Sequence, residues 1–159
     1  MLTMRKSVIA IGCLLTVASL SYAGSDWLKG STEEQLKKLA ELQPGLGTVM
    51  IEYGTRFGIL YHSAKGGNWD FAAYQLKEMR EIQEVGETTR PARAQALKNF
   101  ESTFLNPLDD AIKAKDWKKF KTAFDAAKDG CNTCHEGQKF GYIKYELPSA
   151  SPSPISSKP

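Results

Sequence analysis

The sequence is poor in the residues that most often bind metals or form cross-links. Its 159 residues include only three cysteines, two histidines and four methionines. So few cysteines cannot build the disulfide framework that holds many small secreted domains together. Hydrophobic residues make up 42% of the chain and charged residues 25%, which is ordinary for a globular protein. We therefore expect one domain that folds around a hydrophobic core, with few side chains left for metal chemistry.

The sequence also lacks an excess of charge of one sign. The formal net charge is +3, but two of the positive charges lie in the N-terminal segment, at Arg5 and Lys6. Residues 24–159 contain 19 basic and 18 acidic side chains. Nucleic-acid binding needs a clustered positive field, so this balance predicts that nucleic acid is not a partner.

The only long hydrophobic run is at the N-terminus, and it is short for a membrane span. It covers residues 8–20, whereas an apolar helix needs roughly 20 residues to cross a bilayer. Basic residues precede the run, and Ser21 and Ala23 supply small side chains where a signal peptidase cleaves. We predict that residues 1–23 are a signal peptide for export to the periplasm and that the mature chain does not insert into a membrane. A membrane anchor is the alternative.

No alternation typical of strands occurs, and apolar residues instead recur at spacings of three and four. Four amphipathic helices with short loops predict an all-α, antiparallel up-down-up-down four-helix bundle within residues 24–147. Residues 148–159 are rich in proline and serine, which predicts a disordered tail. We expect a short helix over 31–42 and longer helices over 46–65, 69–85 and 91–114. Gly86 is expected to end the second of these longer helices, and Pro107 to kink the third. Asp116 is expected to cap the start of a fourth long helix.

The motif with the clearest chemistry is Cys131-Asn132-Thr133-Cys134-His135, which has the C-x-x-C-H pattern of covalent haem attachment. Two thiols at this spacing can each form a thioether with a haem vinyl group, while the adjacent imidazole reaches the iron. A thioredoxin-like redox pair, a structural zinc site and a chance match are the competing interpretations. We predict one covalently attached haem c, bound by Cys131, Cys134 and His135.

A helical bundle whose C-x-x-C-H motif lies near the end of its fourth helix resembles the class II c-type cytochromes. These are cytochrome c′ and its low-spin, methionine-ligated relatives, and the resemblance covers about Leu46 to His135. It implies a periplasmic monohaem protein with His135 as one axial ligand. The sequence departs from the family after the motif, because residues 137–148 continue with several aromatic side chains.

The second axial ligand is predicted to be Met50, because low-spin relatives take their methionine from near the start of the first helix. Met50 lies roughly 6 Å along the predicted helix, and Met79 roughly 9 Å from the end of the next. Met79 and an open iron remain alternatives. His62 lies roughly 24 Å from the start of its helix, so we expect it on the surface. Arg93, like Arg90, is a candidate partner for the haem propionates.

These residues predict a cytochrome that transfers single electrons between other redox proteins. The main alternative is a cytochrome c′-like protein with an open iron that binds NO or CO, and a haem-free helical binding module is a third interpretation. The sequence shows no arrangement of acid and base residues for activating a substrate, so we predict that it is not an enzyme. Homodimer formation stays open.

Overall fold

Residues 27–159 are described by the structure, which is a computed structural model. Within these residues all regular secondary structure is helical and there is no strand, which confirms the all-α class. None of the helices in this part of the chain is long and apolar enough to cross a membrane. The chain divides into two units, Met1–Glu41 and Leu42–Pro159. The predicted signal peptide, residues 1–23, lies outside the described residues.

The described part of the first unit contains helix α1 (Thr32–Glu41), which begins with a capping box. The Ser31 hydroxyl accepts a hydrogen bond from the Glu34 backbone N–H at 3.3 Å, and the Glu34 carboxylate accepts one from the Ser31 N–H at 2.7 Å. This reciprocal pair satisfies two backbone donors that a helix start otherwise leaves open. The predicted short helix is therefore confirmed.

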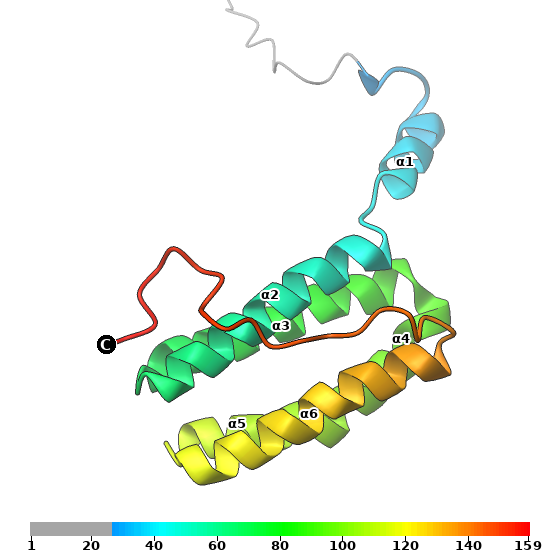
Figure 1. The fold of residues 1–159 in the computed structure, drawn as a ribbon. Helices are drawn as coiled ribbons and strands as arrows, with labels where there is room; N and C mark the ends of the chain where they lie inside the picture. Colours follow the sequence, from blue (N-terminus) through cyan, green and yellow to red (C-terminus); the bar gives the residue numbers. More distant parts are fainter. Residues whose placement is uncertain (1–26) are drawn as a thin grey trace, which may run out of the picture. The chain divides into compact units, whose positions relative to one another are not determined.

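In the second unit, α2 (Leu46–Lys65) and α3 (Trp69–Thr89) lie side by side over most of their lengths (Figure 1). A short turn reverses the chain between them, and Gly67 adopts the left-handed conformation there, with φ +82°. Asn68 then starts α3, since its side-chain oxygen accepts from the Phe71 N–H at 3.1 Å. The bounds of α2 match the prediction.

The predicted end of α3 at Gly86 is wrong, because the helix continues to Thr89. Gly86 is buried, and a Cβ there would lie 3.1 Å from Leu46 and 3.2 Å from Val49. This glycine permits the close approach of α2 and α3 instead of ending the helix. The end falls at Arg90, which precedes Pro91 and whose φ of −135° and ψ of 66° lie outside the helical region.

The segment from Pro91 to Lys113 is helical but not uniform. It contains α4 (Pro91–Phe100), a wider π-helical turn η2 (Glu101–Leu105) and α5 (Asn106–Lys113). We predicted a kink at Pro107, and the structure has the π-helical turn immediately before it. Pro107 has no N–H to donate to the carbonyl four residues back, so the preceding turn widens, and the Asn106 N–H bonds five residues back to Glu101.

Helix α6 (Trp117–Gly137) packs beside α5 and carries the C-x-x-C-H motif near its end (Figure 1). Asp116 caps its start by accepting from the Lys119 N–H at 3.0 Å, as predicted.

Beyond α6 the chain turns back as irregular structure that runs along α2. Residues 148–159 contact α2 and the turn after it, where the Asn68 side chain donates to the Lys158 carbonyl at 3.2 Å. Their predicted disorder stays a prediction.

Candidate functional site

A cavity of about 200 Å³ lies among α2, α4 and the last turns of α6. Its lining includes all four residues predicted to hold the haem, namely Met50, Cys131, Cys134 and His135. The structure thus brings Met50 together with three residues that lie more than 80 positions further along the chain. The remaining walls are mostly apolar, with Leu97 and Phe100 contributed by α4.

The two cysteines face this cavity because of the periodicity of α6. Phe120, Phe124 and Ala127 follow one another at spacings of four and three, and all three are buried. Cys131 and Cys134 continue the same stripe, which turns both thiols toward the other helices. Cys131 packs against the hydrophobic core. The stripe that predicted the helix therefore also orients the motif.

His135 is held by the chain that follows it. Its Nδ1 lies 2.9 Å from the backbone carbonyl oxygen of Ile143. A carbonyl oxygen only accepts hydrogen bonds, so Nδ1 carries the hydrogen and the neutral imidazole keeps a free lone pair on Nε2. Metal-binding histidines usually donate their other N–H to such an acceptor, which fixes the tautomer and the ring orientation.

Residues 138–147, here called the C-terminal strap, provide that carbonyl. Asn132, inside the motif, holds the strap at two atoms of Tyr145. The Tyr145 N–H donates to the Asn132 side-chain oxygen at 2.8 Å, and the Asn132 amide donates back to the Tyr145 carbonyl at 3.4 Å. Sequence reasoning missed this role of Asn132, because a side chain that bonds a backbone thirteen residues away leaves no pattern in the sequence.

The environment of the thiols opposes their ionisation. Burial raises the pKa of Cys131 to about 12, and the neighbouring Cys134 adds to this effect. Burial also raises the pKa of Cys134, although the Arg93 guanidinium acts in the opposite direction. Reactive C-x-x-C pairs lie at helix N-termini, where the pKa of the attacking cysteine is lowered. This pair lies at the C-terminal end of α6, so the thioredoxin-like interpretation is disfavoured.

The other candidates fall in different places. Met79 is fully buried in the hydrophobic core and does not line the cavity. His62 also lies away from the cavity. It is half-buried, and its Nε2 lies 3.0 Å from the Pro148 carbonyl oxygen. Arg93 lines the cavity, whereas Arg90 does not. The Arg93 guanidinium donates a hydrogen bond to the Gln138 side chain and lies 5.7 Å from the centre of the Phe140 ring.

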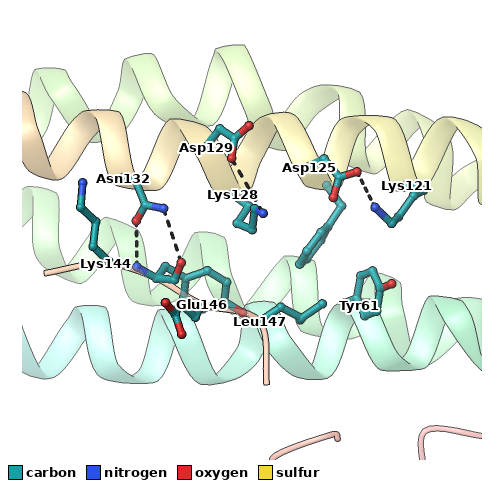
Figure 2. A pocket seen from close by; sticks show the side chains of 11 residues that line it. Tyr61, Lys121, Asp125, Lys128, Asp129, Asn132, Lys144, Glu146 and Leu147 are labelled. Atoms are coloured by element: carbon teal, nitrogen blue, oxygen red, sulfur yellow. Dashed lines mark hydrogen bonds and ion pairs between the residues drawn. The ribbon is translucent and has the colours of Figure 1, made fainter. Parts of the chain in front are cut away.

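A second hollow, of about 490 Å³, lies between α6, α2 and the C-terminal strap (Figure 2). Its charged residues alternate in sign, and Lys121 pairs with Asp125 while Lys128 lies 3.9 Å from Asp129. Figure 2 also shows the two hydrogen bonds by which Asn132 holds the strap. No group of three His, Cys, Asp or Glu side chains that could hold a metal ion occurs within residues 27–159. Cys131, Cys134 and His135 line the first cavity and not this hollow.

Comparison with known proteins gave no match to a family model, to a curated protein or to a solved structure.

Proposed function

We propose that this protein is a periplasmic c-type cytochrome that transfers single electrons between other redox proteins. One haem would be attached through Cys131 and Cys134, and His135 and Met50 would bind its iron. The observation that carries the proposal is that these four side chains line a single cavity. In this interpretation α2, α3, the α4–α5 segment and α6 are the four helices of a cytochrome c′-like bundle.

The residues present fit a haem in three respects. The His135 Nδ1 is occupied by the Ile143 carbonyl, so Nε2 is the nitrogen available to iron. The cavity wall is mainly apolar, as the face of a macrocycle requires. At its margin Phe140 and Ile143 remain 38% and 47% exposed beside the Arg93 guanidinium. Apolar surface next to a cation suits a flat apolar ring that carries propionates at one edge.

The chain's own groups would then have separate tasks. Cys131 and Cys134 would hold the haem through two thioethers. Each S–H would add across one vinyl C=C, the sulfur bonding one carbon and the hydrogen the other, so attachment would need no oxidant. Bound haem supplies the one-electron couple of its iron. His135 and Met50 would bind the iron, and a thioether ligand would favour the reduced metal and so raise the potential. This division leaves no role for a substrate-activating acid or base.

The test is to produce the chain in a bacterium with a cytochrome maturation system and to stain a denaturing gel for haem peroxidase activity. We expect the wild-type band to stain and to gain the mass of one haem. The double variant Cys131→Ala/Cys134→Ala should lose the stain, while a Thr133→Ala control keeps it. An unstained wild-type protein would reject the proposal and favour a haem-free helical module.

A further inference from the structure

We infer that the cavity also contains a polar binding position, formed by Tyr53 and Gln83, for one small uncharged molecule that can donate a hydrogen bond. This inference rests on the proposed function only in that the haem would share this cavity. Both residues line the same cavity as His135. Tyr53 is 5% exposed and Gln83 1%, yet the Tyr53 hydroxyl and the Gln83 Oε1 have no hydrogen-bond partner. Buried polar atoms without a partner are rare in native proteins.

The direction in which Gln83 points is fixed by its amide nitrogen. Its Nε2 faces three acceptors: Glu87 Oε1 at 2.9 Å, the Leu97 carbonyl at 3.2 Å and Glu101 Oε2 at 3.2 Å. All three are acceptors, so the amide nitrogen of Gln83, and not its oxygen, faces them. Glu101 lies on the π-helical turn η2 and is itself paired with Arg80. Gln83 Oε1 is therefore held in place as an acceptor.

The chemistry of the two atoms selects the ligand. Gln83 Oε1 can only accept, so its partner must carry an O–H or N–H, while the Tyr53 hydroxyl can donate or accept. Carbon monoxide and nitric oxide carry no hydrogen and would leave Gln83 unpaired. Phe57, Leu97 and Phe100 line the same cavity and restrict the space. These features point to small protic molecules such as water, hydrogen peroxide or hydroxylamine.

The first test is the melting temperature of Tyr53→Phe, measured on the haem-loaded protein with Tyr74→Phe as the control. Tyr74 is an exposed phenol outside the cavity, so its loss should leave the melting temperature unchanged. The ring of Tyr53 packs edge-on against Phe100 with centroids 6.3 Å apart, and phenylalanine keeps that contact. If the hydroxyl binds a resident water, Tyr53→Phe lowers the melting temperature. An unchanged or raised melting temperature overturns the inference, because removing a truly unpaired hydroxyl does not destabilise the protein.

The second test uses hydroxylamine and carbon monoxide as probes of the melting temperature. We expect hydroxylamine to raise it in a concentration-dependent way in the wild type and to lose that effect in Tyr53→Phe. An equal shift in both proteins, or a shift by carbon monoxide that depends on Tyr53, overturns the ligand assignment. A wild-type protein without haem would refute the proposed function alone, since the melting temperatures of the wild type, Tyr53→Phe and Tyr74→Phe can be compared in the same way on the haem-free protein.

Discussion

The two ends of α6 differ in how they are packed. Around its start, aromatic rings fill the space between the helices, with Tyr61 and Phe124 centroids 4.7 Å apart and Trp117 and Phe120 centroids 5.7 Å apart. Around its other end lie the cavity, the two thiols and the unpaired hydroxyl of Tyr53. We call these regions the aromatic end and the cavity end. They lie on one helix, separated by roughly 20 Å of helix axis.

This difference separates stability from chemistry. Each buried aromatic ring at the aromatic end contributes apolar burial and dispersion contacts to folding. The cavity end holds buried polar atoms that have no hydrogen-bond partner within the chain. Substitutions at the aromatic end should therefore change the free energy of unfolding, whereas those at the cavity end should change the haem and its ligands.

The largest effect on stability is expected from Phe120→Ala. Phe120 is fully buried between the rings of Trp69 and Phe124, and truncating such a residue costs about 3–5 kcal/mol. Urea unfolding measures this loss, and the protein that remains folded should still stain for haem. Phe140→Ala, at the exposed margin of the cavity, is the control and should cost far less. A Phe120→Ala protein that is folded but fails to bind haem would show that the two ends are not separable.

The next prediction contrasts the two methionines. Met79 is fully buried, so Met79→Ala should cost about 2–5 kcal/mol and leave the haem spectrum nearly unchanged. Met50 is half-buried on the cavity wall, so Met50→Ala should cost less stability. It should instead remove the near-infrared band of a methionine–iron bond, shift the ferric iron to high spin and admit carbon monoxide quickly. A wild-type protein that is already high spin would contradict Met50 ligation and favour the gas-binding alternative.

The sequence predicted the helices and the location of the candidate site better than it predicted the contacts between distant residues. Apolar spacing located α2 and the start of α6, and the C-x-x-C-H motif located the candidate site, because both are local patterns. Gly86 was misread as a helix end, since a glycine required by a neighbouring helix looks the same in sequence as one that stops a helix. The strap's hydrogen bonds to Asn132 and His135 join distant residues, and the buried atoms of Tyr53 and Gln83 depend on packing, so no local pattern announces them.

A smaller effect is expected at Gly130, which adjoins the motif. A Cβ at this position would lie 2.6 Å from ring atoms of Phe104 on η2, so Gly130→Ala forces the ring or the helix to move. Overpacking of this kind costs about 1–3 kcal/mol. The double variant Gly130→Ala/Phe104→Leu should recover much of the stability, because the smaller side chain leaves room for the methyl group. Equal stabilities of Gly130→Ala and the wild type in urea unfolding would argue against this close contact.

The smallest effect is expected from loosening the C-terminal strap at Asn132. Asn132→Ala removes both hydrogen bonds to Tyr145, and each such bond contributes about 1 kcal/mol or less in a partly exposed position. Thr133→Ala is the matched control, because the Thr133 hydroxyl is exposed and bonds only within α6, to the Asp129 carbonyl at 3.0 Å.

The strap carries the Ile143 carbonyl that holds His135 Nδ1, so loosening the strap should change the environment of the imidazole. We expect faster amide hydrogen exchange across residues 138–147 and a changed His135 ¹⁵N spectrum in Asn132→Ala. Both should stay unchanged in Thr133→Ala. If exchange quickens while the His135 spectrum does not move, the strap does not orient the imidazole, and α6 alone sets its position.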